Sequence, residues 1–326
     1  MHDTLRVYDD IFGLLPSEEN PTPLVRINRL NPAPDFLLYA KLEWLNPFGS
    51  VKDRPAWNML RRLEAEGRIG PGRKLVEPTS GNTGLSLAAL ASVRGYKLRA
   101  VVPGKVPREK KVLLKVAGAD LEVLNDDVCP APGLGDGAIN RAKSHAKSSP
   151  DEFTLPNQYE NEANIEAHFQ TTGPEIWRQT QGRLTHFFAA LGTCGTITGV
   201  GRFLKSKNPA IKVVAISPSE GHDVPGLRNL SQLGVSKLFD ASVVDDIVEI
   251  DFKLAYTRAV ELSRKEGLLA GPSSGLIFEG ARQIAERDGT GFGVMIFCDN
   301  VFKYVSNLVK HVPELDAPSF GFYPTS

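Results

Sequence analysis

The feature that most constrains this chain is the alternation of buried-type strands with helices along nearly its whole length. Short runs rich in Val, Leu, Ile and Phe are separated by segments whose apolar residues recur at helical spacing. Strands are expected at 37–44, 74–80, 97–103, 120–125, 185–191, 212–218 and 293–299, and helices at 55–69, 84–95, 108–118, 144–152, 199–207, 254–267 and 274–289. Because parallel strands are joined by helical crossovers, this order predicts an α/β protein whose mostly parallel sheets are flanked by helices.

The length of 326 residues is typical of two domains. The helix expected at 144–152 gives way to the strand-like sequence FTLPNQY, so we expect domains at 1–155 and 156–326. The segment 125–138 contains three Gly, two Pro and three Asp, a composition that predicts a surface loop. Such a loop is either an inert insertion or a mobile flap near a site.

Charge and composition exclude several classes of protein. The 38 Lys and Arg balance the 38 Asp and Glu, which argues against a nucleic-acid binder. No apolar run is long enough to span a membrane, and the N-terminus lacks the pattern of a signal peptide. The few, widely spaced cysteines and the histidines predict neither a disulfide framework nor a metal site. We therefore expect a cytoplasmic protein without a metal.

The sequence NPFGSVKDRPA places Lys52 in a tight turn just before a helix. Most loop lysines are simply solvated. Here, however, the neighbours Phe48, Val51 and Trp57 make the surroundings partly apolar. A lysine in such surroundings can form a Schiff base with a carbonyl cofactor.

Two glycine-rich turns between a strand and a helix are candidate anion sites. In EPTSGNTG, the side chains of Thr79, Ser80, Asn82 and Thr83 surround a helix N-terminus, where backbone N–H groups attract a carboxylate or phosphate. The alternative is an ordinary helix cap.

The second turn, GTCGTITG, can wrap a phosphate with N–H groups and hydroxyls, although it is neither a Walker loop nor a Rossmann fingerprint. Its residues are Gly192, Thr193, Cys194, Gly195 and Thr196. Cys194 is interpreted as a small packing residue rather than a nucleophile, because no His neighbours it in the sequence. Further along, GPSSG puts Ser273 and Ser274 at a helix start, where capping and ligand binding are equally plausible interpretations.

These motifs, in this order and together with NQYENEAN at 157–164, resemble those of the fold-type II pyridoxal-phosphate enzymes, in particular the cysteine synthase and cystathionine β-synthase family. The resemblance covers about residues 18–310. It implies two mostly parallel α/β domains, with a mobile substrate-carboxylate subdomain at about 84–155 and a segment, 1–45, that packs on the C-terminal domain. It also implies pyridoxal 5′-phosphate as cofactor and a homodimer.

The resemblance also implies a role for each motif. Lys52 would hold the cofactor covalently, Asn82 would bind its ring hydroxyl, and Ser273, rather than Ser274, would bind its pyridine nitrogen. The loop Gly192, Thr193, Cys194, Gly195 and Thr196 would cradle the cofactor phosphate. The substrate carboxylate would be held by Thr79, Ser80, Thr83 and Gln158. A neutral serine at the pyridine makes the ring a modest electron sink, which suits β-elimination and β-replacement.

The segment SEGHDVPGLRN resembles the part of O-phosphoserine-using cysteine synthases in which an arginine pairs with the substrate phosphate. Arg228 is that arginine here, and a guanidinium fork suits a phosphate dianion. A surface arginine is the alternative. The basic run of Lys105, Arg108, Lys110 and Lys111 is able to add positive potential there, but its simpler interpretation is the solvated end of a helix.

We therefore predict an enzyme that replaces the β-substituent of an O-activated serine, O-phosphoserine or else O-acetylserine, with a sulfur nucleophile to give L-cysteine. The sulfur donor is open and includes a thiocarboxylate carrier protein. The alternative activity is that of a cystathionine β-synthase, or of another β-replacement synthase that uses serine or an amine nucleophile. Thr83 argues against a dehydratase. A degenerate, non-catalytic cofactor binder and a nicotinamide-binding protein are the alternatives from other classes.

Overall fold

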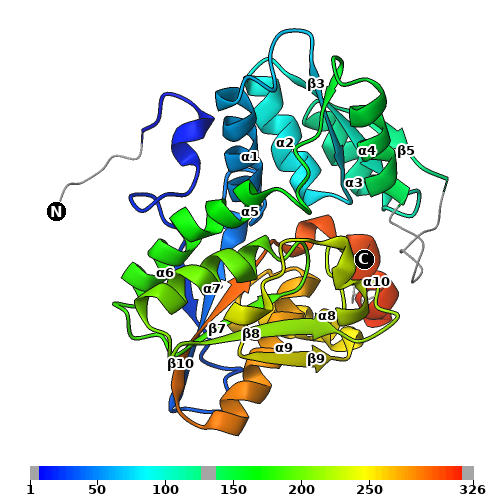
Figure 1. Ribbon diagram of the computed structural model, residues 1–326. Helices are drawn as coiled ribbons and strands as arrows, with labels where there is room; N and C mark the ends of the chain where they lie inside the picture. The colour runs from blue at the N-terminus through cyan, green and yellow to red at the C-terminus, as the bar shows by residue number, and fades with distance from the viewer. Residues whose placement is uncertain (1–6, 126–136, 318–326) are drawn as a thin grey trace.

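The computed structural model describes residues 7–125 and 137–317, which form two lobes with one sheet each (Figure 1). The larger sheet has six strands in the order β1-β2-β10-β7-β8-β9. These are β1 (Leu24–Arg26), β2 (Phe36–Leu42), β7 (His186–Ala190), β8 (Lys212–Pro218), β9 (Asp246–Ile250) and β10 (Gly291–Phe297). Neighbouring strands are parallel except β1 and β2.

The smaller sheet is wholly parallel and has the order β5-β4-β3-β6. Its strands are β3 (Lys74–Pro78), β4 (Lys97–Val102), β5 (Ala119–Val123) and β6 (Phe153–Thr154). The α-helices of the described ranges are α1 (Asp53–Ala65), α2 (Asn82–Val93), α3 (Arg108–Val116), α4 (Gly137–Ser148), α5 (Glu162–Ala167), α6 (Gly173–Gln179), α7 (Gly195–Lys207), α8 (Phe252–Glu261), α9 (Pro272–Asp288) and α10 (Val305–His311). The predicted α/β class with mostly parallel sheets is confirmed.

Both faces of the larger sheet are covered, because successive side chains of a strand point to opposite faces. Along β10, Met295 and Phe297 pack with apolar residues of α8 and α9. The alternating residues Val294 and Ile296 pack on the other side, with residues of α6 and α7. Such two-sided burial is why these strands read as continuous apolar runs in the sequence.

Some elements differ from the sequence-based expectation. The helix expected at 144–152 begins at Gly137 and ends at Ser148, because the residue before Pro150 disfavours the helical conformation. The short elements β1, β9, α5, α6 and α10 were not predicted. Of the loop predicted at 125–138, residues 126–136 lie outside the described part of the chain.

The first two strands of the chain, β1 and β2, belong to the larger sheet, whereas the next four, β3 to β6, form the smaller sheet. β2 pairs with β10 over seven residues, from Phe36 opposite Gly291 to Leu42 opposite Phe297, so the N-terminal segment contributes to the larger sheet. The division at residue 155 and the mobile subdomain at 84–155 stay predictions.

The fold brings the carboxyl ends of β3, β7 and β10 to the region between the lobes. The two glycine-rich turns follow β3 and β7, as expected for ligand sites in parallel sheets. Isolated bridges from Ser50 to Asp299 and from Ala270 to Asn300 add the turn before α1 and the start of α9 to the same region.

Candidate active site

Lys52 lies half-buried in the turn that leads into α1. The N–H of Val51 donates to the carbonyl of Cys298 at 2.8 Å, which ties this turn to the end of β10. The buried Asp53 carboxyl accepts the Phe48 N–H at 2.7 Å and the Ser86 hydroxyl at 2.6 Å, and so fixes the turn against α2. Burial raises the pKa of Asp53 to about 7, against the effect of these hydrogen bonds.

Lys52 and Asn82 line two adjoining cavities of about 60 Å³ each. The first, which we call the glycine-loop cavity, is also lined by Gly192, Thr193, Cys194, Thr196, Ser273, Cys298, Asp299 and Tyr304. The second, the Thr79 cavity, is also lined by Ser80, Gly81, Thr83, Lys110, Gln158, Tyr159 and Tyr304. The fold thus gathers nearly all the predicted site residues around one lysine.

The glycine loop is tightly constrained. A Cβ atom on Gly192 would lie 2.8 Å from the Gly226 carbonyl oxygen, and one on Gly195 would lie 2.0 Å from Asn164 Oδ1. Gly195 therefore packs against Asn164 and does not line the cavity. Cys194 adopts a left-handed conformation with φ 66°, and burial raises the pKa of its thiol to about 12. Cys194 is a neutral packing residue, as predicted from its sequence context.

Thr196 is positioned by a histidine that the sequence analysis did not single out. The buried His168 ring contacts Thr172 Oγ1 through Nδ1 at 2.9 Å and Thr196 Oγ1 through Nε2 at 3.1 Å. Burial lowers the pKa of His168 to about 3, so the ring is neutral. The sequence around His168 does not indicate this role, because its partner Thr196 lies 28 residues further along the chain, in α7.

Asn82 is held by a polar cluster that the sequence analysis also missed. Its Nδ2 donates to Asp299 Oδ2 at 2.6 Å, and its Oδ1 accepts from Lys303 Nζ at 3.0 Å. The Tyr304 hydroxyl donates to the same Asp299 carboxylate. The amide of Asn82 therefore has a single fixed orientation at the rim of both cavities.

The Thr79 turn offers neutral hydrogen-bond donors. Thr79 Oγ1 accepts the N–H groups of Gly81 and Gly84 at 3.1 and 3.0 Å, which leaves its own hydrogen to donate. Thr83 Oγ1 donates to Gln158 Oε1 at 2.6 Å, so Thr83 orients Gln158. Behind them, the buried Glu77 carboxyl accepts the N–H groups of residues 157 and 158 at 2.8 and 3.0 Å.

The two serines at the start of α9 have different surroundings. Ser273 lines the glycine-loop cavity. Ser274 does not, and its buried Oγ has no hydrogen-bond partner within the described ranges. Neither serine caps α9, because the cap residue is Gly271.

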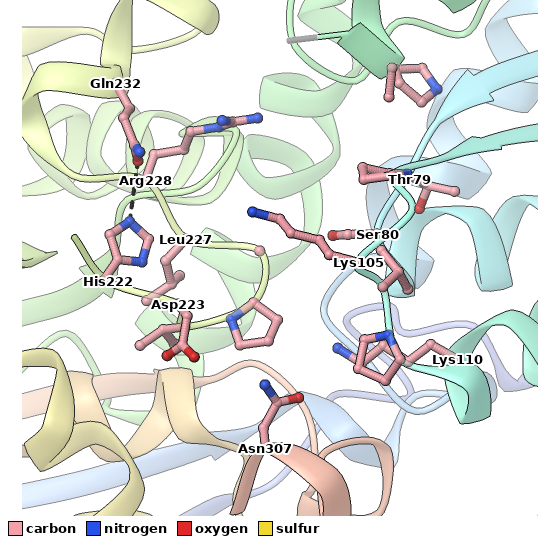
Figure 2. A pocket seen from close by; sticks show the side chains of 18 of the residues that line it. Thr79, Ser80, Lys105, Lys110, His222, Asp223, Leu227, Arg228, Gln232 and Asn307 are labelled. Atoms are coloured by element: carbon pink, nitrogen blue, oxygen red, sulfur yellow. Dashed lines mark hydrogen bonds between the residues drawn. The ribbon is translucent and has the colours of Figure 1, made fainter. Parts of the chain in front are cut away.

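A third and larger hollow, which we call the outer cavity, has a volume of about 300 Å³ and adjoins the Thr79 turn. Figure 2 shows Lys105 and Lys110 reaching into it from the N-terminal lobe, opposite Arg228 and His222. The Arg228 guanidinium lies 5.5 Å from the centre of the Tyr159 ring. The interpretation of the basic run as a solvated helix end is wrong for Lys110, which is only 6% exposed.

Comparison with known proteins agrees with this geometry. Residues 15–299 match the model of the family described as pyridoxal-phosphate dependent enzyme. The chain belongs to the pyridoxal-phosphate dependent enzymes of the cysteine synthase family. It is 40% identical to cysteine synthase B of Salmonella typhimurium over 285 residues, which cover 87% of this chain and 92% of that protein.

Solved structures of the family have the same fold. The structure of O-ureido-L-serine synthase matches with a TM-score of 0.85 and 32% identity, over 97% of both chains. Cysteine synthase from Entamoeba histolytica matches with a TM-score of 0.83 and 29% identity, over 95% of this chain and 93% of the other.

The cofactor of this enzyme is pyridoxal phosphate, and the observed cavity suits it. A half-buried lysine and a serine hydroxyl line the same cavity as a glycine loop in which side chains would clash. No described helix is long and apolar enough to cross a membrane. Within 7–125 and 137–317, no three His, Cys, Asp or Glu side chains are grouped to hold a metal.

Proposed function

We propose that this cysteine synthase acts on O-phosphoserine and replaces its phosphate with a sulfur nucleophile to give L-cysteine. The observation that supports this donor is the outer cavity, which adjoins the Thr79 turn and presents Arg228, Lys105 and Lys310 to a ligand there. Among the described residues of its lining the one carboxylate, Asp223, is already paired with Lys310 at 2.5 Å and with His311 at 2.8 Å. The described part of the lining is therefore net positive and suits a phosphate dianion.

The residues around the glycine-loop cavity would hold the cofactor. In this proposal Lys52 binds it covalently, Asn82 and Ser273 contact its ring, and the loop from Gly192 to Thr196 holds its phosphate by N–H groups and hydroxyls. Pyridoxal phosphate, when bound, supplies an electron-withdrawing ring that acidifies the Cα–H bond of the amino acid.

The chain's own groups would then direct the reaction. Thr79, Ser80 and Gln158 bind the substrate carboxylate, and Thr83 keeps the Gln158 amide in position. Lys52 Nζ, freed when the substrate amino group takes its place on the cofactor, would accept the proton from Cα as the phosphate leaves Cβ with its bonding electrons. The sulfur nucleophile adds to Cβ, and Lys52 returns the proton to Cα.

The test compares two donors in two variants. Arg228→Ala should lower kcat/KM for O-phosphoserine about ten- to hundredfold, the usual effect of losing a hydrogen bond to a charged group. With O-acetylserine as donor, kcat/KM should change little. Arg202→Ala is the matched control, because Arg202 is an arginine of the same half of the chain whose guanidinium pairs with Asp240 outside the cavities. Equal losses with both donors, or a wild-type enzyme that does not use O-phosphoserine, would refute this assignment.

The remaining parts of the proposal concern the setting of the enzyme. A homodimer and a thiocarboxylate carrier protein as sulfur donor are proposals that follow from the family resemblance alone, and a cytoplasmic location is a proposal carried over from the sequence analysis. Sedimentation analysis of the purified chain tests the first of them.

A further inference from the structure

Lys110 is a buried cation that has no polar partner in the described part of the chain. Its side chain is 6% exposed, and it makes no hydrogen bond or ion pair with any described residue. Its Nζ lies 4.0 Å from the centre of the Tyr304 ring, so its contact is with an aromatic face. The desolvation of an ammonium group is costly unless an anion compensates for it.

The other buried cations of the described chain are all satisfied by polar groups. Lys41 pairs with Glu175, and Arg54 pairs with Glu43 and Glu175. Lys303 donates to the Gly49 carbonyl and to Asn82. Lys110 is the exception in this set, and its position in the first turn of α3 adds the positive end of the helix dipole to its own charge.

Lys110 also stands at a junction. It lines both the outer cavity, where Figure 2 shows it, and the Thr79 cavity, so its side chain lies where the two cavities meet. Burial and the nearby Lys303 lower the pKa of Lys110 to about 8, against the attraction of Asp299. At neutral pH the group is still mostly an ammonium, and a desolvated ammonium attracts anions strongly.

We propose that Lys110 binds the anionic sulfur nucleophile at this junction and holds it for attack on Cβ. The inference rests on the proposed β-replacement. In that reaction the two other anionic groups, the substrate carboxylate and the leaving phosphate, already have partners. The substrate carboxylate faces the hydroxyls and amide of the Thr79 turn, and Arg228 serves the leaving phosphate. The nucleophile remains, and its reactive form is the anion.

The chemistry balances with this assignment. The leaving group departs with the electron pair of its bond to Cβ, and hydrosulfide supplies the electron pair of the new C–S bond. The proton removed from Cα by Lys52 returns to Cα. Lys110 forms and breaks no covalent bond and keeps its charge throughout.

The test uses Lys110→Met, which keeps an unbranched stem beside Tyr304 and removes the charge. The apparent KM for sulfide should rise about ten- to hundredfold, while the KM for the amino-acid donor stays within twofold. Rapid mixing of the holoenzyme with O-phosphoserine or O-acetylserine, without sulfide, should give an unchanged rate of cofactor absorbance change. Lys110→Arg should restore most of the sulfide affinity.

Lys115→Met is the matched control, because Lys115 lies on the same helix and is exposed. If this control has the same effect as Lys110→Met, or if Lys110→Met instead impairs the reaction with the donor alone, the proposal is wrong. Should Lys110→Met lower the melting temperature, Lys110→Gln provides the same comparison. If the wild-type enzyme shows no absorbance change with any O-substituted serine, the proposed function has failed, which is a different result.

Discussion

Arg54 lies at the centre of a fully buried ionic cluster, and its replacement by methionine should strongly destabilise the enzyme. Its Nε and Nη2 donate to Glu43 at 2.7 and 2.8 Å, and its Nη1 and Nη2 donate to Glu175 at 2.5 and 2.8 Å. Lys41 contacts Glu175 at 2.8 Å. The four side chains are at most 1% exposed and sum to zero charge.

Arg54→Met would leave two buried carboxylates with one cation. Removing one partner of a buried pair costs about 3–5 kcal/mol, because the remaining charge is desolvated and unpaired. In a chain of this size about 2 °C of melting temperature corresponds to 1 kcal/mol, so we expect a fall of about 6–10 °C. Thermal unfolding of the holoenzyme followed by circular dichroism measures it.

Arg62→Met provides the control on the same helix. Arg62 also contacts two carboxylates, Glu66 and Glu166, but its side chain is 42% exposed, so its loss should cost less than about 1 kcal/mol. Equal shifts in the two variants, or a shift below 2 °C for Arg54→Met, would refute the argument.

The cluster also predicts a dependence on pH. Burial raises the pKa of Glu43, but Arg54 outweighs it and holds the value at about 2. In the wild type this carboxylate stays ionised from pH 5 to 8 and contributes no pH dependence there. Without Arg54 the pKa of Glu43 should rise, so that the folded variant is protonated at Glu43 at pH 5 but not at pH 8. Protonation removes the unpaired negative charge. The destabilisation by Arg54→Met should therefore be smaller at pH 5.

Two further predictions concern the site. Lys52→Ala should abolish turnover with little change in melting temperature, and borohydride should fix the cofactor to the wild type but not to this variant, as measured by mass spectrometry; substantial turnover would exclude the covalent role. Glu77→Gln should lower the free energy of unfolding by about 1–3 kcal/mol and raise the donor KM. The reason is that the NH₂ group of glutamine cannot accept a hydrogen bond, so one of the two backbone N–H groups at residues 157 and 158 loses its acceptor. Burial raises the pKa of Glu77 to about 7, above its unfolded value, so the proton held by the folded state is lost as pH rises from 5 to 8. The unfolding free energy of the wild type should fall over this range more steeply than that of Glu77→Gln, and parallel slopes would contradict the assignment.

The sequence by itself determined the class of fold and most of the residues that meet at the site. Strands buried on both faces are recognisable as apolar runs, and glycine-rich turns after β3 and β7 show where a backbone must approach a ligand. In parallel sheets these turns lie at the same edge, so local patterns were enough to indicate the positions of Lys52, Thr79 and Gly192.

Only the tertiary structure decided which polar side chains share an environment. His168 contacts Thr196, Asp299 contacts Asn82 across 217 positions of sequence, and Lys110, in a basic run that is typical of a solvated helix, lies buried on Tyr304. Burial and pairing are properties of the surroundings after folding, because they depend on which distant segments exclude water from a charged group. A sequence lists the charges, whereas the packing of the two lobes determines which of them are buried and which of the buried ones are paired.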